Sequence, residues 1–345
     1  MKPLTNSPDD FELFRVVAYG HVASSLVWAG IELNLFTALK REPGQSRQAL
    51  AGRLGVGDQP LRILLTGLTA LGLLVKRGEA YECAPLAAEL LDADSPDSYI
   101  PILAWQHHIV YRGLFHFADA VRAGANVGVK EFPGPGATIY ERLSEHPALE
   151  GVFHRAMSAL SARSHRNLVE GFDWGRYRSV VDFGGGDGTN LIALLGRYPG
   201  LRGTVFDIPS VCALADRKIA AAGLAGRLDT RSGDFLADPF PAADCYLFAH
   251  IFTIYSPEEN LALLKKSYAS LPPGGGVVVY NMMGNDDETG PMSAALGSPY
   301  FLAIATGKGM LYPSKEYEGW MRAAGFARVE RLALPLDHFA IIGTK

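Results

Sequence analysis

The sequence predicts an α/β protein with a helical, winged-helix domain over residues 1–100 and a Rossmann-like, doubly wound sheet within residues 101–345. Three observations support this fold class. The chain has 345 residues, more than one ordinary hydrophobic core organises. Apolar residues recur at helical spacing near the N-terminus, whereas apolar runs alternate with helical patterns from about residue 175 onward. Such alternation is typical of a largely parallel sheet with helices on both faces.

The composition is that of a globular protein and argues against several kinds of partner. Hydrophobic residues make up 48% of the chain and charged residues 20%, and the net charge of −4 offers no basic surface for nucleic acid. Cys83, Cys212 and Cys245 are too far apart for a zinc motif or a disulfide framework. We find neither a signal-peptide pattern nor an apolar run of ~20 residues. We therefore expect a cytoplasmic protein without metal, nucleic-acid or membrane partners.

The first domain is expected to be helical apart from one short hairpin. A helix is predicted within residues 11–40, from the pattern "VVAYGHVASSLVWAGIELNLFTAL". Helix, glycine turn, second helix and two short strands around "KRGEAY" then follow, the order of a winged helix. A DNA reader needs exposed polar side chains on the second helix, yet "QPLRILLTGLTALGLL" offers one arginine. A homodimer surface is the preferred interpretation, and a ligand-sensing DNA-binding regulator is the alternative.

Residues 101–172 form a helical segment that precedes the predicted sheet. Two stretches in it, "AWQHHIVYRGLFHFADAVRAG" and "HPALEGVFHRAMSALSARSHRNL", are rich in aromatic residues, histidine and methionine. They suit either an ordinary pair of amphipathic helices or the wall of a substrate pocket, which needs an apolar lining with a few polar groups. The predicted lining residues are Trp105, His108, Tyr111, Phe153, Met157, Met283 and Tyr300.

Strands and helices alternate through the rest of the chain. The predicted strands are "SVVDF", "GTVFDIP", "LDTRSGDF", "DCYLFAH" and "GGVVVYNMM". Helices are predicted at "TNLIALLGRYP", "SVCALADRKIAAAG", "SPEENLALLKKSYASL" and "SKEYEGWMRAAGF". The last two strands, "ARVERLAL" and "HFAIIGTK", are separated only by "PLD" and are expected to form a hairpin at one edge of the sheet.

A glycine loop in "VVDFGGGDGTN" indicates a cofactor site. Its glycines, among them Gly184 and Gly186, permit a sharp turn and let a ligand approach the backbone, and the next helix offers free N–H groups. Asp207 ends the following strand, where a carboxylate accepts hydrogen bonds from ribose hydroxyls. The dehydrogenase pattern G-x-G-x-x-G is broken at Thr189. Asp182, which precedes the loop, suits a ligand that carries a positive ammonium group and lacks a pyrophosphate. A glycine turn without a ligand is the structural alternative.

These motifs give the chain a clear family resemblance. It resembles the class I S-adenosylmethionine (SAM)-dependent methyltransferases, and among them the small-molecule O-methyltransferases of plant phenylpropanoid and bacterial natural-product pathways. The resemblance rests on the winged helix, "HPALEGVFHRAMSALS", "VVDFGGGDGTN", "VFDIP", "SGDF", "PPGGGVVV" and "AAGF". It implies a homodimer with intertwined N-terminal helices, and it places Phe153 and Met157 near the methyl donor and acceptor. The residues it implies for SAM are Gly184, Gly186 and Asp207, with Asp234 and Phe235 beside the adenine.

The sequence departs from this family where the catalytic base is expected. The family pattern "LHDWSDE" supplies a histidine base, but "FTIYSPE" puts Thr253 there, and a threonine hydroxyl is far too weak a base at neutral pH. The family's supporting Glu in "VVEMVL" is replaced by Asn281 in "VVYNMMG", although Glu316 in "LYPSKEY" is retained. Two altered positions together indicate that deprotonation of a hydroxyl by histidine is not the mechanism.

Three explanations stay open at this point. The acceptor needs no strong base, and Thr253 and Asn281 orient it by hydrogen bonds while proximity lowers the barrier. Alternatively, the base has moved, with His250 and His154 the candidates. Finally, the cofactor is kept for a cyclisation, hydroxylation or decarboxylation, in which the sulfonium stabilises negative charge. The preferred function is methyl transfer from SAM to a small, largely apolar or aromatic natural-product intermediate, with oxygen first among acceptors and nitrogen or carbon next.

Overall fold

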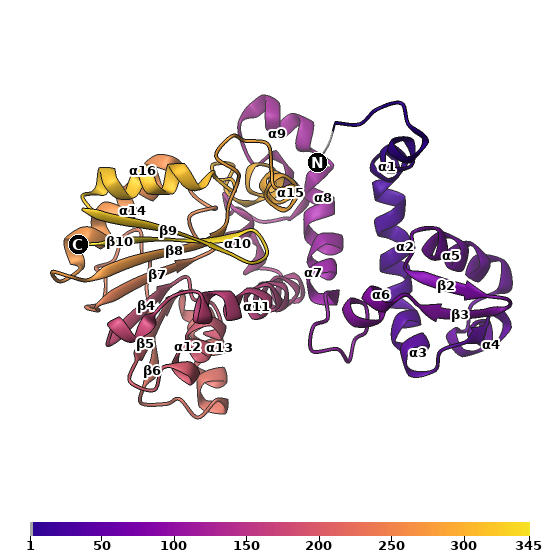
Figure 1. Cartoon of the computed structure of the whole chain (residues 1–345), viewed down its shortest axis with the longest axis horizontal. Helices are drawn as coiled ribbons and strands as arrows, with labels where there is room; N and C mark the ends of the chain where they lie inside the picture. The colour runs from indigo at the N-terminus through magenta and orange to yellow at the C-terminus, as the bar shows by residue number, and fades with distance from the viewer. Residues whose placement is uncertain (1–2) are drawn as a thin grey trace. The chain divides into compact units, whose positions relative to one another are not determined.

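The structure, a computed structural model, describes residues 3–345 and divides into two compact units, Met1–Ile109 and Val110–Lys345 (Figure 1). The boundary predicted after residue 100 falls inside the first unit, because the helix Ile100–Trp105 clusters with the N-terminal elements. The second unit holds the whole of the larger sheet.

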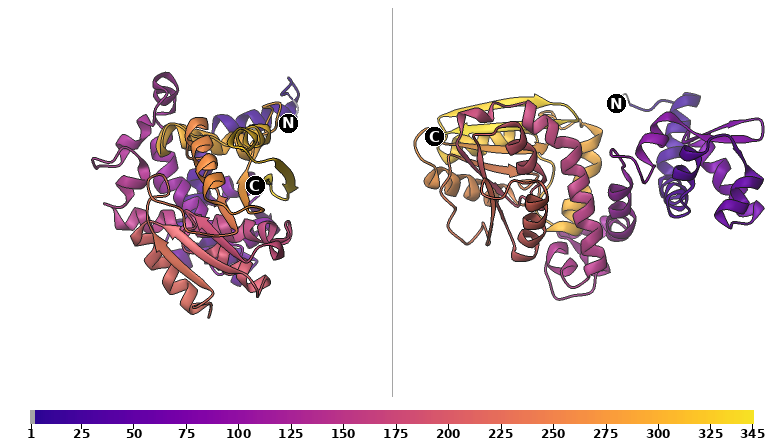
Figure 2. Two further views of the ribbon diagram at one scale, coloured as in Figure 1. Left: turned by 90° about the vertical axis from the view of Figure 1, so that its left-hand side faces the viewer. Right: turned by 90° about the horizontal axis from the view of Figure 1, so that it is seen from below.

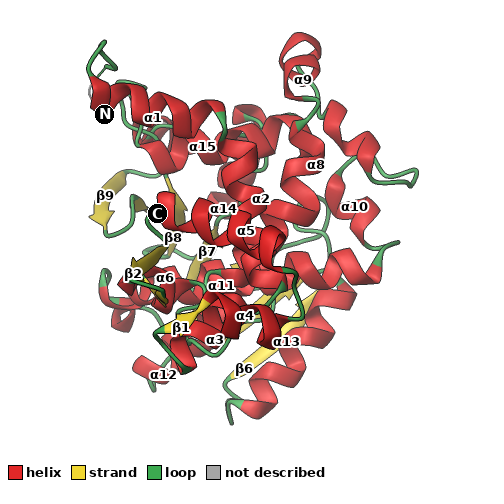
Figure 3. Ribbon diagram, turned by 90° about the vertical axis from the view of Figure 1, so that its right-hand side faces the viewer, coloured by secondary structure: helices red, strands yellow, loops and turns green. Residues whose placement is uncertain are grey.

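The first unit is a winged helix with a small sheet. Its helices are α1 (Pro8–Ala18), α2 (Gly20–Glu32), α3 (Leu35–Arg41), α4 (Arg47–Leu54), α5 (Asp58–Ala70), α6 (Pro85–Leu90) and α7 (Ile100–Trp105). Strands β2 (Leu74–Arg77) and β3 (Ala80–Cys83) form the expected hairpin (Figure 1). The sequence did not predict β1 (Gln45–Ser46), which pairs with β3; β1 and β2 are labelled in Figure 3. The unit is therefore not entirely helical outside the wing.

The apolar second helix of the winged-helix motif is α5, and it packs inside its own unit. The α5 side chains Leu61, Leu64, Leu65 and Leu68 are buried in one core cluster with α3. By contrast α1 buries none of its residues and exposes Phe11, Phe14 and Val17. Within residues 3–345 no single helix has the length and apolarity to cross a membrane, although the bent pair α2–α3 meets both criteria when its helices are taken together.

The second unit begins with helices and continues with strand–helix repeats. The leading helices are α8 (Tyr111–Leu114), α9 (Phe117–Ala123), α10 (Ile139–Leu143) and α11 (Pro147–Glu170). The repeats are β4 (Ser179–Phe183), α12 (Thr189–Arg197), β5 (Arg202–Asp207), α13 (Pro209–Ala221), β6 (Leu228–Ser232), β7 (Cys245–Ala249), α14 (Pro257–Ser270) and β8 (Gly276–Met282). The chain ends with α15 (Met292–Tyr300), α16 (Ser314–Ala324), β9 (Arg328–Leu334) and β10 (His338–Thr344).

The large sheet has the order β6-β5-β4-β7-β8-β10-β9. The first five strands in this order are parallel, and β10 runs antiparallel to both of its neighbours, so the predicted edge hairpin is confirmed. Successive strands run outward from β4 to β6 on one side and from β7 to β8 on the other. Ligands in such sheets bind where the order reverses, at the carboxyl ends of the strands. Here that point lies beyond β4 and β7.

Both faces of this sheet are covered by helices (Figures 1 and 2). In β7, Cys245 and Leu247 pack in one core cluster with α12 and α13, whereas Tyr246 and Phe248 pack in another with α14 and α16. A strand buried on both faces is expected to be apolar throughout, which explains the continuous run "CYLFA".

Candidate active site

The glycine loop joins the first strand of the sheet to α12. Gly184 and Gly186 have φ values of 66° and 61°, in the left-handed region that favours glycine. A Cβ added to Gly185 would lie 3.0 Å from the carboxyl carbon of Asp182. The loop therefore needs small residues to pass this close to the carboxylate.

Asp182 is a fully buried acid without a hydrogen-bond partner of good geometry for either carboxylate oxygen. Burial raises the pKa of Asp182 well above its usual value, nearby Asp207 raises it further, and the Asn190 side chain opposes the shift. Unpartnered buried carboxylates are rare and unfavourable in folded proteins unless a cation joins them. An orphaned acid beside a glycine loop fits the ammonium group of SAM.

Asp207 is held at the carboxyl end of β5, next to the same loop. Its two oxygens accept hydrogen bonds from the backbone N–H groups of Gly186 (2.9 Å) and Ile208 (2.8 Å). Burial raises the pKa of Asp207, those two N–H groups oppose the rise, and His154 opposes it as well. The carboxylate is placed where ribose hydroxyls bind in sheets of this kind.

The loop after β6 carries Asp234 and Phe235. The Asp234 carboxylate accepts a hydrogen bond from the Leu236 backbone at 2.8 Å, and the half-buried Phe235 ring meets Tyr255 edge-on at 6.0 Å. Lys266 donates to the Phe235 carbonyl at 2.8 Å and so fixes the loop from α14. The loop presents an aromatic face and a carboxylate together, which suits a purine with its ribose.

Thr253 lies in the turn between β7 and α14 and is 1% exposed. Its hydroxyl donates to the backbone carbonyl of His250 at 3.2 Å. Asn281 lies on the neighbouring strand β8, is fully buried, and has no partner for either amide atom. A hydroxyl has one proton and two lone pairs, and the Thr253 proton is already donated, so the Thr253 oxygen can only accept a further hydrogen bond. The Asn281 amide can both donate and accept.

Glu316, which the family resemblance matches to a family glutamate, lies in the first turn of α16. The bridge between Gly284 and Pro313 brings the start of α16 to the end of β8. Burial and the neighbouring Glu288 raise the pKa of Glu316, and Lys315 opposes the rise. The buried Met283 lies two residues beyond Asn281, with the Ser314 hydroxyl 3.4 Å from its sulfur.

His250, a candidate base, belongs to a buried ring cluster. Its ring contacts Tyr280 and His338 at centroid distances of 5.4 and 5.3 Å, and its Nε2 is buried without a partner. Its φ of 61° is left-handed, unusual for a residue that is not glycine. Burial lowers the pKa of His250 to about 3, and His338 adds to this effect. An imidazole this weakly basic is a poor proton acceptor for a hydroxyl.

His154, the other candidate, lies on α11. Its Nε2 is 3.8 Å from Glu150, its ring meets Phe153 edge-on, and it interacts electrostatically with Asp207. His154 thus lies near enough to Asp207 to lower the pKa of that carboxyl, while its ion-pair partner is Glu150.

The predicted lining residues fall into both units. Phe153 meets the Tyr140 ring at 5.8 Å, and the hydroxyl of the half-buried Tyr140 interacts with that of the buried Tyr300. Met157 is partly buried on α11, Met283 is fully buried, and Tyr111 is 53% exposed. Trp105 and His108 belong to the first unit, where His108 packs edge-on against Trp28.

The chain matches the O-methyltransferase domain family over residues 114–327 and the O-methyltransferase dimerisation domain over residues 16–93. It belongs to the O-methyltransferase family. It is 36% identical to the L-tyrosine C(3)-methyltransferase of Streptomyces lavendulae, over 99% of this chain and 95% of the relative. It is also 36% identical to the 3-hydroxy-5-methyl-1-naphthoate 3-O-methyltransferase of Streptomyces sahachiroi, over 96% of this chain and 95% of that relative.

Solved structures of similar methyltransferases agree with this assignment. The SAM-dependent methyltransferase SibL in its apo form is 37% identical, with a TM-score of 0.83 over 96% of this chain and 98% of that one. Human N-acetylserotonin methyltransferase in complex with SAM is 26% identical, with a TM-score of 0.88 over 99% of both. The predictions of a SAM-dependent methyltransferase and of a winged-helix dimerisation domain are therefore confirmed, while the roles of single residues stay predictions.

Several residues of this O-methyltransferase site carried no signal in the sequence. Tyr140 lies in a five-residue helix, and His338 lies on the last strand, far along the chain from His250. Ser158 and Lys218 meet at Asp187 only because α11 and α13 converge on the loop. Among residues 3–345, no group of three or more histidine, cysteine or acidic side chains is arranged to hold a metal ion.

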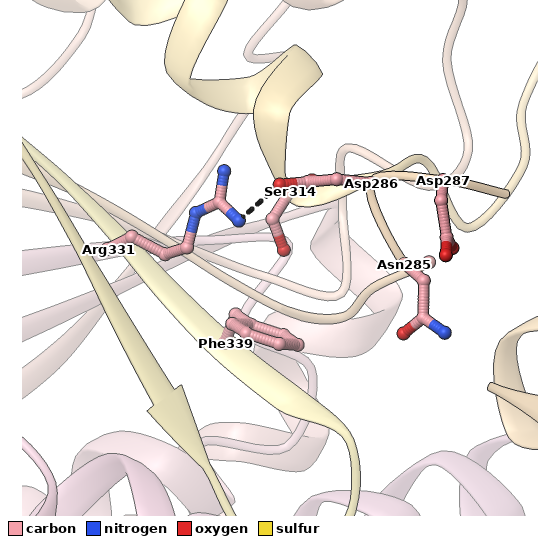
Figure 4. Close-up of a pocket in the computed structure, with 7 residues that line it drawn as sticks. Asn285, Asp286, Asp287, Ser314, Arg331 and Phe339 are labelled. Atoms are coloured by element: carbon pink, nitrogen blue, oxygen red, sulfur yellow. Dashed lines mark hydrogen bonds and ion pairs between the residues drawn. The ribbon is translucent and has the colours of Figure 1, made fainter. Parts of the chain in front are cut away.

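A polar cavity of about 350 Å³ lies at the start of α16 (Figure 4). Arg331 in its lining pairs with Asp286 at 2.6 Å and also contacts Glu318. The cation of this lining is thus already neutralised, and we assign the cavity no part in methyl transfer. Its lining residues are Gly284, Asn285, Asp286, Asp287, Ser314, Arg331 and Phe339.

Proposed function

We propose that this enzyme methylates the ring of a small phenol at the carbon next to the hydroxyl. One observation carries the proposal: Thr253, which the family resemblance matches to the position of the base, is buried and donates its proton to a backbone carbonyl. Neither Thr253 nor Asn281 removes a proton from a hydroxyl at neutral pH. An acceptor that reacts before it loses a proton fits such a site.

Methylation of a ring carbon has this order of events. Bound SAM supplies an electrophilic methyl group. The ring carbon forms the new C–C bond as the methyl–sulfur bond breaks, and the ring proton then leaves to solvent, which restores the aromatic ring. The phenol hydroxyl donates a hydrogen bond to the Thr253 oxygen, and this hydrogen bond increases the electron density of the ring. The Asn281 amide fixes the orientation of the ring. Alignment of the reacting carbon supplies much of the barrier reduction.

A tyrosine-like phenol is the proposed substrate class. The similarity to an L-tyrosine C(3)-methyltransferase over 99% of the chain supports it. Within the second unit, the aromatic Phe153, the thioether Met157 and the hydroxyl pair Tyr140–Tyr300 offer an apolar lining with neutral polar groups. O-methylation of an acidic phenol is the second candidate, favoured by the equal identity to a naphthoate O-methyltransferase.

We also propose that the enzyme acts as a cytoplasmic homodimer whose other partner is its small-molecule acceptor. The dimerisation domain and the exposed apolar residues Phe11, Phe14 and Val17 of α1 support the dimer. The three free cysteines support a reducing compartment.

Carbon-labelled SAM distinguishes the two acceptor atoms. The enzyme is incubated with methyl-labelled SAM and either L-tyrosine or a hydroxynaphthoate, S-adenosylhomocysteine (SAH) is quantified, and the product methyl is assigned by NMR as C-bound or O-bound. We expect an aryl C-methyl product and one SAH per product. An O-methyl product would establish the second candidate instead. Product without SAH would contradict methyl transfer altogether.

Restoring the base tests the same reasoning from the other direction. The double variant Thr253→His with Asn281→Glu rebuilds the family's proton acceptor, so we expect it to shift the product from C-methyl to O-methyl. The single variant Asn281→Glu is the control, since it adds the supporting carboxylate without the histidine. An unchanged C-methyl product from the double variant would contradict the assigned role of Thr253.

A further inference from the structure

Asp187 stands at the meeting point of three elements beside the cofactor loop. One carboxylate oxygen accepts hydrogen bonds from the Ser158 hydroxyl of α11 (2.6 Å) and from the Lys218 ammonium of α13 (2.7 Å). The other oxygen accepts from the Thr189 backbone (3.2 Å) and hydroxyl (2.6 Å) at the start of α12. Lys218 also donates to the Thr189 hydroxyl at 2.6 Å, which closes the network.

The network keeps the carboxylate charged. Burial of Asp187 opposes ionisation, but the hydrogen bonds from Lys218, Ser158 and Thr189 outweigh it and lower the pKa of Asp187 below its usual value. Hydrogen bonds to a charged group are stronger than those between neutral groups. The side chain is 23% exposed, so solvent screens these interactions only in part. The contacts therefore form an ordered junction.

This junction joins the cofactor loop to the helix that carries two predicted substrate residues. Ser158 directly follows Met157 on α11 and lies little more than one turn after Phe153. The C-terminal half of α11 is held separately, since the Tyr280 hydroxyl donates to the Ser164 carbonyl and the Asn167 amide donates to the Pro335 carbonyl. Ser158 thus ties the substrate-bearing half of α11 to the loop.

On the other side of Asp187, the loop is fixed by the cofactor acid. The Gly186 N–H donates to the Asp207 carboxylate at 2.9 Å. A ligand that binds Asp207 and the loop glycines therefore contacts the loop at Gly186. The next residue, Asp187, is already hydrogen-bonded to Ser158 of α11. Loop position and helix position are linked through one side chain.

We propose that Asp187 is a positioning residue that transmits occupancy of the cofactor loop to α11, so that cofactor binding orders Phe153 and Met157 for the acceptor. The proposal rests on the assignment of the glycine loop to SAM. It makes Ser158 the specific link to the substrate helix and Lys218 the link that anchors the loop to α13.

The test uses SAH as the probe and needs no acceptor. Affinity is measured by calorimetry, and amide hydrogen exchange is followed across α11. In the wild type we expect SAH to slow exchange in the segment 150–160. Ser158→Ala should bind SAH within about 3-fold of wild type yet lose most of that added protection. Asp187→Asn should lose the protection and also weaken SAH binding about 10-fold, because it leaves the Lys218 charge without its partner.

Matched variants separate positioning from a structural role. Ser158→Thr retains the hydroxyl and should restore the SAH-induced protection. Asp216→Asn removes an exposed carboxylate on α13 that accepts from Thr230 at 2.8 Å, and should bind SAH and protect α11 as the wild type does. Circular dichroism checks that each variant is folded. Lys218→Met, which leaves α11 untouched, provides a second measurement of loop anchoring through SAH affinity.

The outcomes distinguish this inference from the proposed function. Wild-type protection of α11 in Ser158→Ala, or wild-type SAH affinity in both Asp187→Asn and Lys218→Met, would overturn the positioning role. Absence of SAH binding to the wild-type enzyme would instead overturn the cofactor assignment on which the role rests. Loss of protection with retained affinity in Ser158→Ala, restored in Ser158→Thr, is the result that supports it.

Discussion

Replacing Asp182 with asparagine tests the cofactor site most directly. Asp182 is fully buried, and neither carboxylate oxygen has a partner of good geometry. The substitution keeps the shape and removes the charge, so it should weaken binding of the ligand ammonium without opening a cavity. A hydrogen bond to a charged group contributes about 1.5–3 kcal/mol. Since about 1.4 kcal/mol corresponds to tenfold in Kd, SAH affinity should fall about 10- to 100-fold.

The stability of the ligand-free protein should change in the opposite direction. Burial, with Asp207 adding to it, raises the pKa of Asp182 above its usual 3.8. The folded protein therefore loses stability as the pH rises from about 4, where the unfolded chain ionises, up to the raised pKa of the folded state. Asp182→Asn removes this loss, so the variant should be at least as stable as the wild type at neutral pH, and its advantage should disappear near pH 4.

Calorimetric titration with SAH between about pH 5 and about pH 8, paired with urea denaturation, measures both effects. Wild-type affinity should rise with pH, because the ammonium binds the ionised carboxylate, and the dependence should be weaker in the variant. Asp216→Asn serves as a surface control. Wild-type SAH affinity in Asp182→Asn, or a clear loss of stability at neutral pH, would refute the reasoning.

Three further predictions concern the base position and the dimer. Asn281→Leu replaces an unpartnered buried amide, so urea denaturation should show a gain of about 1–2 kcal/mol in unfolding free energy while methyl transfer is lost; destabilisation would indicate that the amide has partners. His250, with its pKa lowered to about 3, stays neutral near pH 7, so the kcat/KM profiles of wild type and His250→Asn should have the same shape between about pH 5 and about pH 8; a step lost in the variant would contradict this. Phe14→Lys with Val17→Lys places charge on the exposed face of α1 and should give monomers by analytical ultracentrifugation, whereas an intact dimer would place the interface elsewhere.

Features encoded locally were predictable from the sequence. The glycine loop, the acid before it and the acid ending β5 follow from short-range spacing, and the structure places Asp182, Gly186 and Asp207 in contact or close to it. The edge hairpin followed from two strand patterns joined by a tight turn. Each of these depends on neighbours within a few tens of residues.

Features created by distant packing were not predictable. His250 meets His338 because β10 inserts between β8 and β9, a pairing that no local pattern encodes. The low pKa of His250, which weighs against it as a base, arises from this burial. The junction at Asp187 likewise requires two helices to converge on one loop. Sequence periodicity specifies which face of an element is apolar, but it does not specify which elements meet.

If Thr253 contacts the acceptor as we propose, its hydrogen bond to the His250 carbonyl determines which form of a substrate is accepted. With its single proton engaged, the Thr253 oxygen favours an acceptor that still carries its own hydroxyl proton and repels one that has become an anion. The site would then discriminate by protonation state, and turnover would decline above the pKa of the acceptor itself. An enzyme built this way leaves strongly acidic phenols in the same cell unmodified, even when they match its preferred substrate in size and shape.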